Sequence, residues 1–239
     1  MNKVLIIIPA YNEAKNIGPV LKDLKKEISY SDIIVINDCS IDDTKKIVEE
    51  NGINCITNVF NMRYAWAIQV GIKYAKYHNY DYAIFMDADG QHLASEATKL
   101  YDAIVKTNSD IVIGSRYLKK TGYKCPFFRR VGTKFFELIV KLLTGKKIAD
   151  PLSGFQCINK KVINFWSECG NYPEYPDANL IIEMILKGYK ITEIPVKMKN
   201  REDGVSMHSG VWKPIRYMTT QFYTCIVTFV KYIGKRRIK

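Results

Sequence analysis

Short apolar runs rich in β-branched residues recur along the first half of the chain, at residues 4–8, 33–36, 82–86 and 111–113. Stretches with apolar residues at helical spacing separate these runs. Strands that are apolar throughout are typical of a sheet covered on both faces. Alternating strands and helices favour parallel pairing with right-handed crossovers. The pattern predicts an α/β fold with a mostly parallel central sheet flanked by helices. The predicted helices of this half are 16–28, 43–50, 65–77 and 96–107.

The second half is less regular. Residues 131–143 have the periodicity of an amphipathic helix, and residues 180–187 begin another helix that Gly188 is expected to end. Residues 189–196 then return as a strand. The last block, residues 211–239, is apolar and aromatic with basic ends. We predict one domain over residues 1–210, followed by a basic amphipathic helical segment over residues 211–239.

Composition adds a strong positive charge. Lysine and arginine number 36 against 24 aspartates and glutamates, which gives a formal net charge of +12. This surplus favours anionic partners, namely nucleotide phosphates, acidic lipid head groups or nucleic acid. The six cysteines are scattered without metal-ligand spacing, as is typical of reduced thiols in a cytosolic protein. The short apolar start of the chain indicates a strand rather than a signal peptide. No run approaches the roughly 20 apolar residues of a spanning helix, so we expect none.

Polar residues follow directly on each apolar run. The four clusters are residues 9–13 (PAYNE), 37–40 (NDCS), 87–89 (DAD) and 115–116 (SR). Ligands of open parallel sheets bind outside the carboxyl ends of the strands. We therefore expect the four clusters to meet at one edge of the sheet and to form a ligand site there.

Two aspartates one residue apart, Asp87 and Asp89, end the third apolar run, and Gln91 follows. Oxygen donors of this kind suit Mg²⁺ or Mn²⁺, which commonly need one or two carboxylates when substrate phosphates supply further ligands. Aspartate is also common in turns and at helix starts, and this alternative explains the pair equally well when it is taken alone.

The first two clusters contain groups that suit a nucleoside. A carboxylate at Asp38 can accept a hydrogen bond from a base N–H, Tyr11 can stack on the base, and Glu13 can approach a ribose or a metal-bound water. Each alone is more often an ordinary loop residue. Asp42 or Asp43 is expected to cap the following helix.

Five motifs in order carry a resemblance to a known family. They are PAYNEAKNI at 9–17, INDCSIDDT at 36–44, DADGQH at 87–92, GSRY at 114–117 and DPLSGF at 150–155. Together they resemble the family 2 glycosyltransferases, which are inverting enzymes with a GT-A fold that use nucleotide-activated sugars. The closer likeness is to the dolichyl-phosphate mannose synthase branch and to bacterial relatives that glycosylate polyprenyl phosphate or lipid-linked glycans. The resemblance covers roughly residues 3–205.

The resemblance implies roles for particular residues. The nucleoside would be held by Pro9, Tyr11, Glu13 and Asp38, and the Mg²⁺ or Mn²⁺ ion and the diphosphate by Asp87, Asp89 and Gln91. Phosphates would be held by Arg116, Arg129 and Arg201. The alternative for Arg129 is a solvated surface position.

The sequence departs from the family's pattern at several positions. Asn37 replaces the first aspartate of a pair, Arg63 and Ala65 stand where glycines are common, and Met207 replaces a lysine.

The acceptor decides whether the reaction needs a base. A lipid phosphate is already anionic near neutral pH, whereas a sugar hydroxyl requires a carboxylate base. The candidate bases are Asp150, Asp177 and Glu183, and Asp150 ranks first because it precedes the turn expected to face the acceptor. The alternative for Asp150 is a turn-capping role. His92 is either a group that orients phosphate or a structural residue.

Aromatic residues beside lysines and arginines near the C-terminus favour a helix at a membrane interface, and packing on the domain or a second subunit is the alternative. We predict a metal-dependent glycosyltransferase that moves sugar from a UDP-, GDP- or dTDP-sugar to a lipid-linked acceptor, in the cytoplasm on the inner face of the cell membrane.

Two other functions are alternatives. A nucleotidyltransferase is the first alternative, but no glycine-rich loop with a lysine follows the first strand. A noncatalytic basic module that binds membranes is the second. Acidic strand ends disfavour nucleic acid as a partner.

Overall fold

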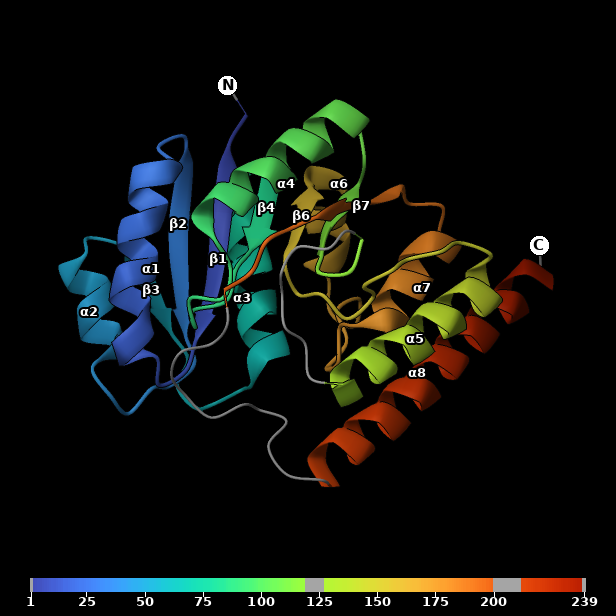
Figure 1. Cartoon of the computed structure of the whole chain (residues 1–239). Helices are drawn as coiled ribbons and strands as arrows, with labels where there is room; N and C mark the ends of the chain where they lie inside the picture. The colour runs from blue at the N-terminus through green and yellow to red at the C-terminus, as the bar shows by residue number, and fades with distance from the viewer. Residues whose placement is uncertain (1, 119–126, 200–211, 238–239) are drawn as a thin grey trace.

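The chain folds around a twisted sheet with helices on both faces (Figure 1). The computed structural model describes residues 2–118, 127–199 and 212–237. Within them one seven-stranded sheet has the order β3-β2-β1-β4-β6-β5-β7. Only β6 runs antiparallel to its neighbours. The strands are β1 (Val4–Ala10), β2 (Ser31–Asn37), β3 (Asn54–Thr57), β4 (Tyr82–Phe85), β5 (Ile111–Ser115), β6 (Gln156–Asn159) and β7 (Ile191–Pro195).

Two apolar clusters fill the space between the sheet and its helices. Alternate residues of β1 divide between them, with Ile6 and Ile8 in one cluster and Leu5 and Ile7 in the other. Helices α1 (Ala14–Glu27), α2 (Thr44–Glu50) and α4 (Ala94–Thr107) cover the first face. The second face is covered by α3 (Tyr64–Tyr77), α6 (Lys160–Trp166) and α7 (Ala178–Leu186), with α5 (Phe127–Thr144) and α8 (Trp212–Arg237) outside them. This burial on both faces explains the uninterrupted apolar runs.

The predicted mostly parallel α/β sheet is confirmed. Strands β3 and β6 and helix α6 were not predicted. Each of these strands has four residues, and β6 lies between β4 and β5 because of long-range pairing that local periodicity does not show. Gly188 ends α7 as expected, because it has φ +83° and Tyr189 N–H donates to the carbonyl of Met184 at 3.0 Å.

The carboxyl ends of the strands meet at one edge. Asp38 N–H donates to the Ala10 carbonyl (2.8 Å), which ties the end of β2 to that of β1. Met86 N–H donates to Ile7 (3.1 Å), which places the start of the 87–92 turn beside β1. Val196 N–H donates to Ser115 (3.1 Å). The predicted convergence of the polar clusters is therefore confirmed.

Two further features concern the part of the chain that the structure describes. No helix there combines the length and apolar character that a membrane crossing needs. The cysteines described, Cys39, Cys55, Cys157, Cys169 and Cys225, are free thiols.

Candidate active site

The loops after β1 and β2 are bound to each other. Asn12, whose φ is +54°, donates its N–H to Ser40 Oγ (3.0 Å) and accepts the N–H of Ile41 at its Oδ1 (2.9 Å). Asp43 is the N-cap residue of α2, but its side chain makes no capping hydrogen bond; the preceding Asp42 accepts the N–H of Thr44 instead (3.0 Å). These bonds leave Tyr11 at the rim with 47% of its surface exposed, where its ring is open to a ligand.

Asp38 is buried beneath this rim, with 3% of its surface exposed. Its Oδ1 accepts from Asn58 Nδ2 (2.7 Å) and from Met62 N–H (2.9 Å), and its Oδ2 accepts from Arg63 N–H (2.7 Å). The carboxylate therefore fixes the loop 58–63 that leads into α3. An ionised carboxylate has about four acceptor positions, so one remains for a ligand.

The turn after β4 is fixed by its own residues. Asp89 Oδ1 accepts the N–H of Gln91 (3.0 Å), and Gly90 between them has φ +76°. His92 accepts the N–H of Asp87 at its Nδ1 (3.0 Å), and its ring stacks on Phe155 with centroids 4.3 Å apart.

Burial lowers the pKa of His92 to about 4, with Asp89 opposing and Arg116 adding to the effect. The imidazole is therefore neutral at physiological pH. It carries its proton on Nε2, which lies 3.7 Å from Asp87 Oδ2. This geometry gives His92 a structural role in holding the turn.

The donors in this turn fit a hard divalent cation. Asp87, Asp89 and Gln91 present carboxylate and amide oxygens, and the Tyr64 hydroxyl hydrogen-bonds to Asp87. The described residues contain no group of three or more histidine, cysteine, aspartate or glutamate side chains that would enclose a metal ion. An ion held here would therefore need oxygens from a bound diphosphate or from water.

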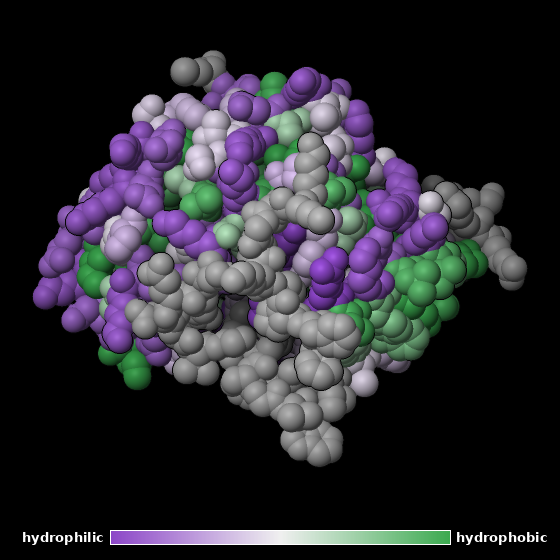
Figure 2. Space-filling view, in the orientation of Figure 1, coloured by the Kyte–Doolittle hydropathy of each residue, from purple (hydrophilic) through white to green (hydrophobic). Residues whose placement is uncertain are grey.

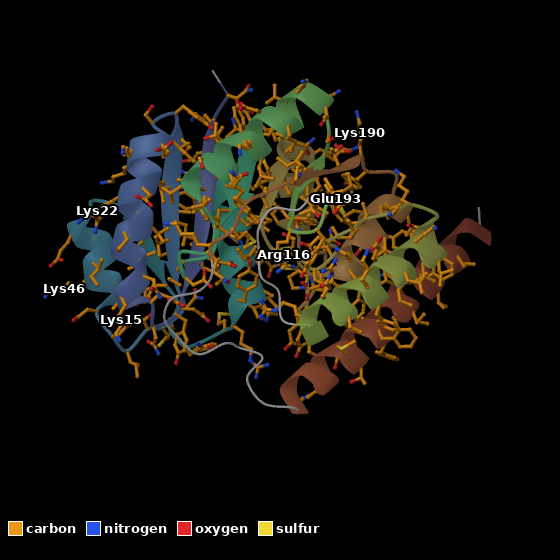
Figure 3. All side chains as sticks on the ribbon, viewed as in Figure 1. Lys15, Lys22, Lys46, Arg116, Lys190 and Glu193 are labelled. Carbon is orange, nitrogen blue, oxygen red and sulfur yellow. The ribbon has the colours of Figure 1, made fainter. Side chains whose placement is uncertain are left out.

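Arg116 and Asp150 form a buried bidentate pair. Arg116 Nε and Nη2 donate to the two Asp150 oxygens at 2.7 Å and 2.8 Å, and its backbone N–H donates to Oδ2 at 3.0 Å. Asp150 has no exposed surface. Behind the pair, Glu193 accepts the N–H groups of Ala149 and Asp150, and burial raises its pKa. Figure 3 shows Arg116 and Glu193 at the centre of the molecule, while the labelled lysines of α1 and α2 point outward. In this arrangement Asp150 positions Arg116 and is not open to a hydroxyl acceptor.

Asp177 stands at the start of α7 and contacts α8. Its carboxylate accepts a hydrogen bond from the Tyr217 hydroxyl of α8. A second, buried hydrogen bond between the two helices runs from Gln221 Nε2 to Asn179 Oδ1 (3.0 Å). Burial raises the pKa of Asp177 to about 6, while the Tyr217 hydrogen bond and Arg116 oppose the shift. Sequence reasoning missed Tyr217 and Gln221. The helical i, i+4 spacing of Tyr217, Gln221 and Cys225 was the available signal for an inward face.

The remaining predicted residues differ in their distance from this edge of the sheet. Glu183 is farther along α7, where its Oε1 accepts the Tyr232 hydroxyl (3.0 Å). Arg129 is exposed in the first turn of α5. Glu13 accepts from Asn16 Nδ2 (2.6 Å) and Pro9 is half-buried at the end of β1. Arg201 and Met207 lie outside the described residues.

Residues 5–165 match the family model described as Glycosyl transferase family 2. The chain belongs to this family. It is therefore a glycosyltransferase, and its sheet and flanking helices are those of the GT-A fold.

The family assignment agrees with individual relatives. A UDP-N-acetylglucosamine–dolichyl-phosphate N-acetylglucosaminyltransferase of Methanococcus voltae is 29% identical, over 81% of this chain and 84% of the relative. A polyprenol monophosphomannose synthase of Mycolicibacterium smegmatis is 27% identical, over 87% and 82%. The glycosyltransferase therefore resembles the branch that the sequence motifs indicated.

The fold also matches a solved structure, that of glucosyl-3-phosphoglycerate synthase from Mycobacterium tuberculosis in complex with Mn²⁺, UDP and glucosyl-3-phosphoglycerate. The TM-score is 0.64, with 98% of this chain and 80% of that chain covered. At 14% sequence identity, this likeness concerns the fold alone.

Proposed function

We propose that this glycosyltransferase moves a sugar from a nucleotide sugar to a polyprenyl phosphate at a membrane surface, with inversion at the anomeric carbon. The observation that carries the proposal is the convergence of Tyr11, Asp38, Asp87 and Asp89 at one edge of the sheet, in a chain of this family. The names of the two relatives support the acceptor, because they specify dolichyl phosphate and polyprenol.

The donor would lie across the carboxyl ends of β1, β2 and β4. The nucleoside would be held by Pro9, Tyr11, Glu13 and Asp38, since the loops that carry them are hydrogen-bonded to each other. Asp87, Asp89 and Gln91 would hold a Mg²⁺ or Mn²⁺ ion with the diphosphate. When bound, such an ion stabilises negative charge on the leaving diphosphate. The solved structure of the same fold holds Mn²⁺ together with UDP, which agrees with an ion at the diphosphate.

The acceptor phosphate needs no proton removed before it attacks. Its oxygen forms a bond to the anomeric carbon as the bond from that carbon to the donor diphosphate breaks, so the products are a nucleoside diphosphate and a polyprenyl phosphate sugar. The pairing of Asp150 with Arg116 agrees with a reaction that does not require Asp150 as a base. Arg116, Arg129 and Arg201 would attract the phosphates. If the acceptor is instead a hydroxyl, Asp177 would be the candidate base, because burial raises the pKa of Tyr64 and both Asp177 and Asp87 lie near enough to that hydroxyl to add to the shift.

The membrane surface would be the outer face of α5 and α8, which we call the α5/α8 face. Figure 2 shows a continuous apolar area over these helices. Phe135 of α5 contacts Phe222 of α8, with ring centroids 5.8 Å apart. The exposed apolar residues of this face are Val131, Phe135, Leu138, Leu142, Phe222, Tyr223, Ile226, Val227, Val230 and Ile233.

Exposed cations border the α5/α8 face, namely Arg129, Arg130 and Lys141 of α5 and Arg216 and Lys231 of α8. An apolar face with cationic borders suits an interface with anionic lipid, where each basic residue contributes about 1 kcal/mol. The lipid phosphate of the acceptor would then lie in the same surface layer as the protein. This supports a location on the inner, cytoplasmic face of the cell membrane.

The proposal is tested in two steps. Thermal unfolding is followed with UDP, GDP and dTDP, each with and without Mn²⁺, because a ligand that binds only the folded state raises its stability. The nucleotide sugar of the selected base is then incubated with undecaprenyl phosphate. We expect a nucleoside diphosphate and a glycosylated lipid phosphate as products. A parallel reaction supplies the matching nucleoside triphosphate and a sugar 1-phosphate. Release of pyrophosphate there, without glycosylation of the lipid in the first reaction, would indicate a nucleotidyltransferase and would refute the proposal.

A further inference from the structure

Arg63 has a backbone conformation that normally belongs to glycine. Its φ is +71° and its ψ is 168°. For comparison, Asn108 has φ 48° and ψ 48°, which is the left-handed helical region that asparagine tolerates. The conformation of Arg63 lies outside that region and is strained for any residue with a Cβ atom.

Surrounding bonds hold this conformation on both sides of the residue. Arg63 N–H donates to the buried carboxylate of Asp38 (2.7 Å), and its carbonyl accepts the N–H of Ala67 (3.1 Å) at the start of α3. Glycine would make the same two backbone bonds without strain. The reason for an arginine here must therefore lie in its side chain.

Among the residues that the structure describes, this side chain pairs with Glu174, and the pair is too weak to be the reason. Arg63 Nη1 lies 3.4 Å from Glu174 Oε1, and these side chains are 75% and 54% exposed. Ion pairs this exposed add little or nothing to stability, whereas backbone strain of this kind is a larger cost. The Glu174 pair therefore cannot offset the strain.

Arg63 lies between the two ends of the proposed donor site. Its own N–H bonds to Asp38 at the nucleoside end. The next residue, Tyr64, hydrogen-bonds to Asp87 at the diphosphate end. Glu174, in the segment before α7, pairs with the guanidinium. A planar guanidinium in this position is suited to two parallel bonds with a phosphate or carboxylate.

We propose that Arg63 is a specificity-determining residue whose guanidinium binds an oxyanion of the nucleotide sugar, and that Glu174 occupies the guanidinium when no donor is bound. This inference rests on the proposed function, because it requires that the donor bind at this edge. The oxyanion belongs either to the diphosphate or to a carboxylate on the sugar. Both sources offer the same chemistry, and binding measurements distinguish them.

The test compares Arg63→Gly with wild type. The glycine variant loses the guanidinium and also the strain, so we expect the Tm of the free protein to rise by roughly 2–4 °C. Its affinity for the donor should fall about tenfold or more, because a hydrogen bond to a charged group is lost. A variant that gains stability and loses binding shows that the strain is retained for function. Asn108→Gly, at a positive-φ position at the end of α4, is the control and should leave the affinity unchanged.

Titrations with UDP, UDP-glucose and UDP-glucuronate locate the oxyanion, or the corresponding GDP compounds if the protein selects guanine. Weaker binding of all three to Arg63→Gly assigns the diphosphate, and weaker binding of UDP-glucuronate alone assigns the sugar carboxylate. Unchanged binding of all three would overturn the inference, as would a folded Arg63→Gly variant whose Tm is lower than that of wild type. If Arg63→Gly does not fold, Arg63→Ala, which retains the strained backbone, should show the same loss of affinity without the gain in Tm. A wild-type protein that binds none of these compounds would refute the proposed function itself.

Discussion

Replacing Asp150 with alanine should destabilise the protein strongly. Asp150 is fully buried, and it accepts two guanidinium bonds and one backbone bond from Arg116, whose side chain is only 12% exposed. Removing one partner of a buried pair leaves the other charge without compensation, which costs about 3–5 kcal/mol. For a chain of this size, that corresponds to a fall in Tm of roughly 6–20 °C.

The measurement is urea unfolding of wild type, Asp150→Ala and the double variant Asp150→Leu/Arg116→Met. Two apolar residues remove both charges together, so the double variant should be less destabilised than Asp150→Ala, by about 2 kcal/mol. Glu174→Ala is the matched control, because it breaks the exposed pair with Arg63 and should cost less than about 1 kcal/mol.

Two results would refute the positioning role of Asp150. The first is a loss of stability in Asp150→Ala no larger than that of the exposed control pair. The second is an Asp150→Asn variant that keeps full stability but loses turnover, because this combination is the signature of a base. These measurements therefore separate a role in positioning Arg116 from the base that the sequence ranked first.

Four further outcomes are expected. Asp89→Asn should abolish sugar transfer with little change in Tm. Asp102→Asn, on the exposed side of α4, is the control and should leave transfer intact. Turnover retained by Asp89→Asn would exclude Asp89 as a ligand of the metal ion. Val230→Asp should release the protein from vesicles that contain anionic lipid, as measured by sedimentation. Val105→Asp on α4, which is also exposed, is the control and should leave vesicle binding unchanged. Equal sedimentation of both variants would exclude the α5/α8 face as the membrane surface. Because burial raises the pKa of Asp177 from 3.8 to about 6, ionisation of this group should lower stability as pH rises through this interval. Tyr217→Phe removes a hydrogen bond to the carboxylate and should move the NMR-monitored pKa of Asp177 higher; an unchanged pKa would contradict the contact.

The sequence predicted those parts of the molecule whose signal is local. Apolar runs identified β1, β2, β4 and β5 because both faces of these strands are buried. The Asp-x-Asp pair could be assigned to a ligand site because it directly follows an apolar run, and the carboxyl ends of parallel strands share one edge of the sheet. The remaining features depend on tertiary contacts. The Arg116–Asp150 pair joins residues 34 positions apart, and the glycine-like conformation of Arg63 depends on Asp38. Neither feature can be predicted from the periodicity of the sequence.

Helix α8 shows why a boundary at residue 210 does not separate catalysis from membrane contact. Its inward residues belong to the domain, since Gln221 and Cys225 are fully buried and Tyr217 bonds to Asp177 at the start of α7. Its outward residues form half of the α5/α8 face. Deleting residues 211–239 would therefore expose the buried face of α7 and remove Tyr217 along with the apolar surface. Loss of activity after such a deletion would not distinguish a missing anchor from a disrupted site. Single substitutions on the outward face, such as Val230→Asp, leave the inward contacts in place, so a loss of vesicle binding with unchanged Tm isolates the membrane role.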